Sequence, residues 1–186
     1  LETSPHDEAV LNARFEAARQ LYNACLDEAK RRLDLLCQSK ECQCARSMPK
    51  TVNGKPNKER TEAFKALNAK FGFSEYDIHI YATTIRNSWI GNHIDSATTQ
   101  KIATRAFKAV QRVARGLAKR VRFKGKNQLK SVEGKTNTTG IRYALCVGLI
   151  KASISRSIDE HKAQTYGNTG HIEWKGLKLK CIIDPN

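Results

Sequence analysis

The chain has 186 residues, of which 40% are hydrophobic, and it carries 33 Lys or Arg against 18 Asp or Glu. This length suits one large domain or two small ones with an adequate core. The longest apolar stretch, residues 143–150, is far too short to span a bilayer, and no basic start followed by an apolar run opens the chain. Six cysteines at irregular spacing favour a reduced compartment over a disulfide framework. We therefore expect a soluble, intracellular, cytoplasmic protein with no membrane partner.

The first half of the chain is predicted to be helical. Ser4 can act as an N-cap, Pro5 suits the first helical position and Asp7 completes a capping box. Apolar residues then recur at helical spacing and predict one long helix over residues 5–36. A polar loop with helix-breaking Pro and Gly residues follows in residues 37–57. Shorter helices are predicted over residues 58–70 and from Ser74 to Trp89.

The positive charge is concentrated in the next part of the chain. Residues 96–151 contain 14 Lys or Arg and one acidic residue, which is a net +13 of the total +15. Residues 100–126 contain ten Lys or Arg and no Asp or Glu. A field of one sign this dense favours a polyanion as partner.

This charge begins on a predicted helix, which Ser96 caps and which extends to about residue 121. On a helical wheel its cations fall within roughly one quarter of the circumference, opposite the apolar residues from Ile102 to Leu117. The cations are Lys101, Arg105, Lys108, Arg112, Arg115 and Lys119. Their row covers roughly 27 Å, comparable to one turn of duplex nucleic acid. A solvated helix face usually interleaves acidic residues, so we expect this row to contact nucleic acid.

The charge continues beyond this helix into a Gly-containing loop. The basic residues expected to contact phosphates there are Arg120, Arg122, Lys124, Lys126 and Lys130. Such contacts give salt-dependent binding without reading bases. Phe123 lies among them, either as a stacking platform or as a packing anchor of the loop.

The last third of the chain is predicted to be rich in strands. Alternation predicts strands in residues 141–147 and 172–183, with a tight turn at Trp174–Leu177, and a short helix is expected over residues 149–164. The predicted fold class is therefore α+β, with a helical domain over residues 1–121 and a β-rich domain over residues 122–186. A strand that runs into a turn at the end of the chain suggests a fragment of a longer protein.

No catalytic site is predicted within the chain. Metal-assisted phosphodiester cleavage needs several convergent carboxylates, and the acidic residues from Glu133 onwards are few and scattered. Cys37, Cys42 and Cys44 could hold zinc together with Cys25, but their spacing is not that of a zinc ribbon. We expect reduced thiols and no metal there.

Two segments resemble one known family. Residues 4–32, SPHDEAVLNARFEAARQLYNACLDEAKRR, resemble the first recognition-lobe helix of the TnpB/OrfB transposon-encoded proteins, in which a start with Pro and Glu leads to an aromatic residue and then Tyr-Asn. Residues 96–134 are similar to the family's second signature, a Ser-capped helix with Ala-Phe-Lys followed by a basic Arg-Phe-Lys segment that enters the wedge domain. The two segments cover about a third of the chain, in the expected order.

The resemblance implies the nucleic-acid-binding part of an RNA-guided DNA endonuclease related to type V CRISPR effectors. In such proteins a helical recognition lobe and a small β-barrel-like wedge domain hold the guide RNA and its heteroduplex with target DNA, and contact the short motif beside the target. The catalytic carboxylates and their magnesium belong to a RuvC-like domain, expected beyond the end of this chain. The residues that the resemblance implies as contacts are Lys101, Arg105, Lys108, Arg112, Arg115, Arg122, Lys124 and Lys126. Base pairing, not the protein, would read the target sequence.

Two other interpretations stay open. The chain could be a non-catalytic binding module, either a nuclease-dead RNA-guided repressor or a generic basic RNA-binding protein. The basic face could instead dock an acidic protein. High salt weakens all of these complexes, so competition by RNA is what separates them.

Overall fold

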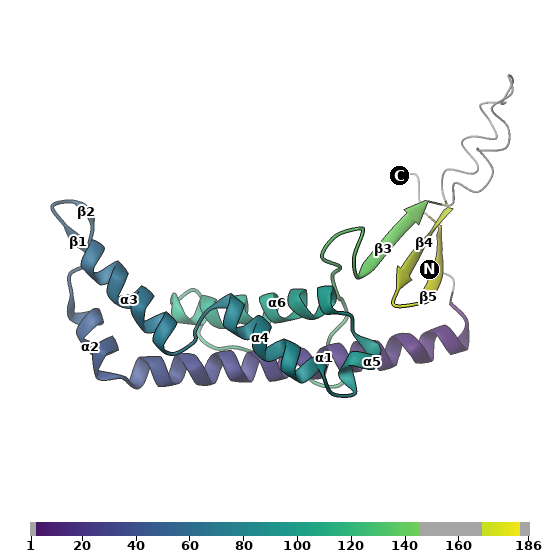
Figure 1. The fold of residues 1–186 in the computed structure, drawn as a ribbon, viewed down its shortest axis with the longest axis horizontal. Helices are drawn as coiled ribbons and strands as arrows, with labels where there is room; N and C mark the ends of the chain where they lie inside the picture. The colour runs from purple at the N-terminus through teal and green to yellow at the C-terminus, as the bar shows by residue number, and fades with distance from the viewer. Residues whose placement is uncertain (1–2, 146–168, 183–186) are drawn as a thin grey trace, which may run out of the picture.

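The computed structural model describes residues 3–145 and 169–182, which form six helices and two antiparallel sheets (Figure 1). The helices are α1 (Pro5–Gln38), α2 (Lys40–Ser47), α3 (Lys58–Lys70), α4 (Glu75–Arg86), α5 (Ile90–His93) and α6 (Ser96–Ala114). The strands are β1 (Thr51–Val52), β2 (Lys55–Pro56), β3 (Ile141–Leu145), β4 (Thr169–Trp174) and β5 (Leu177–Ile182). The α+β class predicted from the sequence is confirmed. No helix in the described part of the chain is both long enough and apolar enough to cross a membrane.

Helix α1 runs along the whole helical part of the molecule, and its start matches the prediction. The Ser4 hydroxyl accepts a hydrogen bond from the Asp7 N–H, and the Asp7 carboxylate accepts one from the Ser4 N–H, which is the reciprocal capping box. Pro5 occupies the first turn, where a missing N–H costs nothing. The helix ends two residues later than expected, before Ser39, which caps the next helix.

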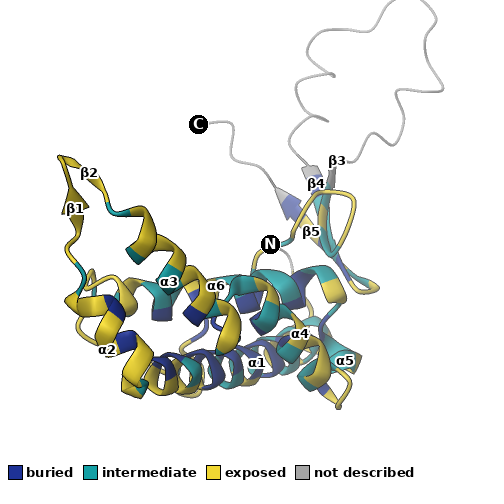
Figure 2. Cartoon of the chain, turned by 60° about the vertical axis from the view of Figure 1, so that its left-hand side comes forward, coloured by how far each residue is buried: buried dark blue, intermediate teal, exposed yellow. Residues whose placement is uncertain are grey.

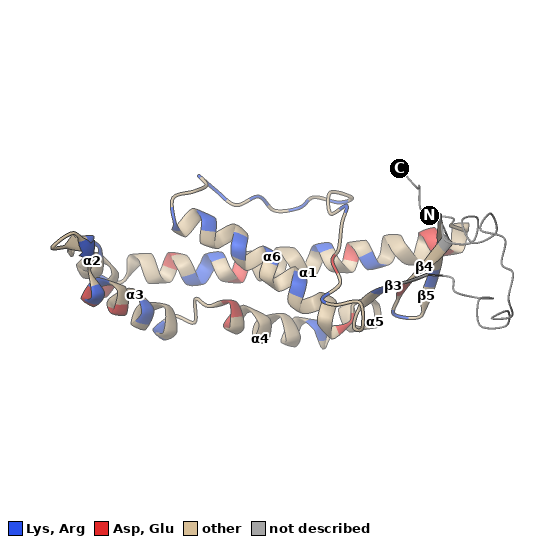
Figure 3. Cartoon of the chain, turned by 90° about the horizontal axis from the view of Figure 1, so that it is seen from above, with Lys and Arg blue, Asp and Glu red and all other residues tan. Residues whose placement is uncertain are grey.

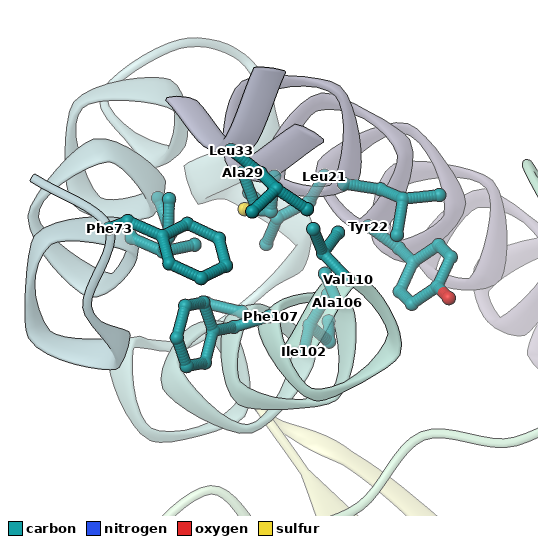
Figure 4. Close-up of a cluster of buried hydrophobic side chains, with 14 of the residues drawn as sticks. Leu21, Tyr22, Ala29, Leu33, Phe73, Ile102, Ala106, Phe107 and Val110 are labelled. Carbon is teal, nitrogen blue, oxygen red and sulfur yellow. The ribbon is translucent and has the colours of Figure 1, made fainter. Parts of the chain in front are cut away.

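The core lies where α1, α4 and α6 pack against one another. Figure 4 shows Leu21 and Ala29 of α1 facing Ile102 and Val110 of α6. Phe73, just before α4, packs on Phe107 of α6 with ring centroids 5.2 Å apart. Each large side chain buried here contributes about 1.5–3 kcal/mol, so this three-helix contact is the main source of stability for the helices.

An arm projects from the far end of α1 and corrects one prediction. The polar loop expected over residues 37–57 contains a helix, α2, whose N–H groups are capped by the Ser39 side chain, and a small hairpin of β1 and β2. Cys42 and Ala45 of α2 are buried, whereas most of the arm is exposed (Figure 2). The prediction was wrong because Pro49, Gly54 and Pro56 break the chain only after α2. Helix α3 has the predicted bounds.

Helix α4 is shorter than predicted. It ends at Arg86, and Trp89, expected on its buried face, lies outside it and is half-exposed. Ile78 and Ala82 are buried as expected. The short α5 then turns the chain into α6.

Helix α6 begins and ends differently from the prediction. Its N-cap is Asp95, whose carboxylate accepts from the Thr98 N–H at 2.8 Å, so Ser96 is the first helical residue. At the other end Gly116 has a φ of +73°, its N–H donates to Val113 O, and the Leu117 N–H donates to Arg112 O. This is a Schellman motif, which satisfies the last carbonyl groups. The expected continuation to residue 121 is therefore wrong, and Leu117 is exposed instead of buried.

Strands β3, β4 and β5 form an antiparallel sheet in chain order. Lys175 and Gly176 both have positive φ between β4 and β5, which is the backbone of a two-residue hairpin turn, as predicted for Trp174–Leu177. The described strands make an open sheet. The helix predicted over residues 149–164 lies outside the described residues.

The sheet is attached to the helices at the β4–β5 turn. The buried Arg14 of α1 donates hydrogen bonds to the carbonyl oxygens of Trp174 and Lys175. The indole Nε1–H of Trp174 donates to Asp95 at 3.2 Å, so one carboxylate caps α6 and holds the sheet. Trp174 and Leu129 belong to the same core cluster as the helices. The domain boundary predicted at residue 121 stays a prediction.

Candidate nucleic-acid interface

Residues 115–140, called here the return segment, contain most of the dense positive charge and have almost no regular structure. Figure 3 shows the segment leaving the end of α6 and running alongside that helix in the opposite direction, towards β3. Leu129 anchors it in the core with 6% of its surface exposed. The cations of α6 and those of the return segment are thereby brought side by side.

Two side chains of α1 hold the backbone of the return segment. Asn23 Nδ2 donates to the Lys124 carbonyl oxygen at 2.9 Å, and the Lys124 N–H donates to Asn23 Oδ1 at 2.9 Å. Arg19 Nη1 donates to the same carbonyl oxygen at 3.0 Å. Both polar groups of a backbone without sheet or helix partners are thus satisfied by side chains.

The Arg19 guanidinium is itself held in place by Glu16. Its Nε and Nη2 donate to the two carboxylate oxygens of Glu16 at 2.8 and 2.6 Å. These bonds, together with one from Gln20, lower the pKa of Glu16 to about 2. Glu16 is therefore ionised throughout the physiological pH range and keeps Arg19 pointed at Lys124.

A groove of about 870 Å³ lies between the end of α6, the start of the return segment and α1. Its lining is Tyr22, Ala109, Arg112, Ala118, Lys119, Arg120, Val121, Arg122 and Lys124, and we call it the basic groove. Five of these nine residues are Lys or Arg, and none is acidic. Burial of Tyr22 in its wall raises the pKa of that phenol, which stays neutral. Such a groove can hold the phosphate backbone of a nucleic acid.

The predicted cation row of α6 is divided by this arrangement. Towards the start of the helix, Arg105 donates to the Ser131 carbonyl oxygen at 3.0 Å, and Lys101 lies 4.0 Å from the carboxylate of Glu133. Towards its end, Arg112 lines the basic groove. Lys108 lies between them and is exposed. The row predicted to be unbroken is thus partly engaged with the protein's own chain.

The remaining predicted contacts follow the helix end. Arg115 is the C-cap residue, and Lys119 and Arg120 lie in the return segment, not on α6 as the wheel had placed Lys119. Lys126 is exposed, and its positive charge contributes to the lowered pKa of Glu16. Lys130 lines a smaller depression of about 200 Å³ beside Arg19.

Two residues of the site were missed by the sequence analysis. Arg19 and Asn23 are not part of the positive segment, yet they fix its backbone. A signal existed for Asn23, a polar residue between Tyr22 and Cys25 at the border of an apolar helix face.

The cysteines do not form a metal centre with their neighbours in the described ranges. Cys42 is buried, Cys44 is exposed, and the thiol of Cys37 accepts from Arg46 Nη2 at 3.1 Å. Within residues 3–145 and 169–182, no group of three or more His, Cys, Asp or Glu lies close enough to hold a metal ion. The same part of the chain offers no ligand set for the magnesium that the family resemblance implies.

Comparison of the chain with protein-family models, with curated proteins and with solved structures gives no match.

Proposed function

We propose that this chain is the nucleic-acid-binding part of an RNA-guided DNA endonuclease and that its basic groove holds the backbone of RNA. The observation that carries the binding role is the lining of the groove, which includes Arg112 of α6 and four cations of the return segment and no acidic residue. Cations that repel one another are held together here by the Asn23 and Arg19 contacts, an arrangement that becomes favourable when a polyanion neutralises it.

The guided-nuclease role has its support in the sequence resemblance. Both resembling segments contribute to the groove, since Tyr22 and Asn23 come from the first and Arg112 to Lys124 from the second. In the proposed protein, residues 1–121 are the recognition lobe, and residues 122–186 belong to a β-barrel-like wedge domain. Guide RNA and target DNA are the proposed partners, and magnesium would serve a nuclease domain outside this chain.

The direct test is to purify the chain at moderate salt and to sequence the nucleic acid that accompanies it. A single RNA species with a constant structured part and a variable end is the expected result. A mixture of transfer and ribosomal RNA would refute the guided role and reduce the protein to a basic RNA-binding module. A preparation without nucleic acid that also fails to bind added RNA would refute the binding role.

A pair of charge reversals tests the groove itself. Arg112→Glu places a carboxylate in the groove, and we expect about tenfold weaker RNA binding in a filter-binding assay. Lys65→Glu makes the same change of charge on the exposed face of α3 and is the matched control. Equal losses for the two variants would mean that net charge, not the groove, governs binding.

A further inference from the structure

Phe123 is an aromatic side chain with no packing role in the described core. Its side chain is 48% exposed, and it is absent from both the buried cluster and the apolar residues packed against that cluster. Val121, two residues earlier, does pack there. The sequence left open whether Phe123 anchors the loop, and the structure gives that part to Val121 and Leu129.

The backbone beside Phe123 is fixed. The next residue, Lys124, has both its N–H and its carbonyl oxygen bonded to α1, through Asn23 and Arg19. One residue further on, the Gly125 N–H donates to Gln128 Oε1 at 2.9 Å. The main chain next to the ring is therefore already ordered, so it loses little conformational entropy when a ligand stacks on Phe123.

The surroundings of Phe123 favour one class of ligand. It lies between Arg122 and Lys124, which line the basic groove, and three residues before Lys126. An exposed aromatic ring next to a track of cations is the combination by which proteins hold single strands, because the cations bind the backbone and the ring stacks on a base. Bases inside an A-form duplex are already stacked on each other and offer no free face.

We infer that Phe123 stacks on an unpaired base of the RNA whose backbone occupies the basic groove, so that this end of the site takes a single-stranded segment. The inference rests on the proposed RNA-binding function and adds to it the kind of RNA bound. Phe123 acts here as a positioning residue for an unpaired nucleotide next to the cations.

The test compares two fluorescent RNAs of the same base composition, one a single strand on the order of ten nucleotides long and the other a blunt duplex. Binding of the whole chain to each is measured by fluorescence anisotropy. Phe123→Ala is expected to weaken single-strand binding about 5- to 150-fold, the range for loss of one base–aromatic contact, and to leave duplex binding within about twofold. Phe123→Trp is expected to keep single-strand binding because it retains a ring.

The matched control is Tyr76→Ala, which removes a 72% exposed aromatic residue from α4, away from the groove. If Phe123→Ala behaves like Tyr76→Ala on the single strand, or weakens both RNAs equally, the stacking inference is refuted while RNA binding stands. If the unaltered chain binds neither RNA, the proposed function fails as well.

Discussion

Asn23 shows how one amide side chain can replace a missing strand neighbour. Its oxygen and nitrogen bond the N–H and carbonyl oxygen of Lys124, as a paired strand would. Because the two residues lie 101 positions apart, their contact joins α1 to the segment that follows α6. The geometry of the basic groove depends on this contact.

Replacing Asn23 with Ala removes both of these hydrogen bonds. We expect a loss of about 1–3 kcal/mol, from two bonds of about 0.5–1.5 kcal/mol each, and weaker RNA binding because the groove wall is released. Hydrogen exchange at the Lys124 amide is the local measurement, and urea unfolding gives the stability. Asn92→Ala is the control, since Asn92 is an exposed asparagine of α5, away from the Asn23 contact. Unchanged exchange at Lys124 would show that Arg19 and Leu129 suffice.

At the scale of elements, the end of α6 decides the shape of the site. The Schellman motif at Gly116 turns the chain out of the helix, so that the following cations come back beside Arg112. A helix continued to residue 121 would have carried Lys119 about 7.5 Å beyond Ala114 along a straight axis. No groove would then form between the helix and the next segment.

Substitutions at Gly116 test this helix end. An added Cβ meets no atom within 4 Å, so the cost comes from the backbone alone, whose φ is +73°. We expect Gly116→Ala to cost about 1–2 kcal/mol and Gly116→Asn less, because Asn tolerates the left-handed region better. Thermal unfolding should rank the three proteins as Gly, Asn, Ala in falling Tm. Equal Tm values for Ala and Gly would mean that the helix end can rearrange without strain.

The sequence predicted elements whose signals are local and failed where tertiary contacts decide. Ser4, Pro5 and Asp7 set the start of α1 within one turn, and the hairpin at Lys175 and Gly176 follows from its turn chemistry. Helix α2 was missed because it is short and buries only two residues. Gly116 was a usable stop signal that the regular spacing of cations concealed. The five cations of the groove were among the predicted contacts, but their convergence depends on Asn23, whose partner no local pattern reveals.

At the scale of the whole molecule, some cations contact other parts of the chain, whereas others line the basic groove. Lys101 and Arg105 contact the return segment, whereas five cations line the groove. The arm of α2 and α3 carries acidic residues among its basic ones, as in the pair of Lys65 and Glu62. Within the described residues, attraction of a polyanion is therefore expected to be strongest at the C-terminal end of α6.

The salt dependence of RNA binding reports how many of these cations contact phosphates. If the five in the groove contact phosphates of a single strand, the slope of log K against log salt concentration should be about −3.5. Titrations by anisotropy at several salt concentrations measure it, and Arg122→Glu should reduce the slope by about 1. A slope near about −5.6 would mean that Lys108, Lys126 and Lys130 also bind, so that the groove is only part of the interface.

The hydrogen bonds from Arg14 to Trp174 and Lys175 can form only late in the synthesis of the chain. These partners are 160 residues apart, and α1 buries its apolar face mainly against α4 and α6, which are translated later. At about 5–20 residues per second, α1 leaves the ribosome on the order of ten seconds before the residues that complete its packing. During that interval the nascent helix exposes Leu21, Cys25 and Leu26, which are buried in the folded protein. A pause in translation within this window would prolong that exposure.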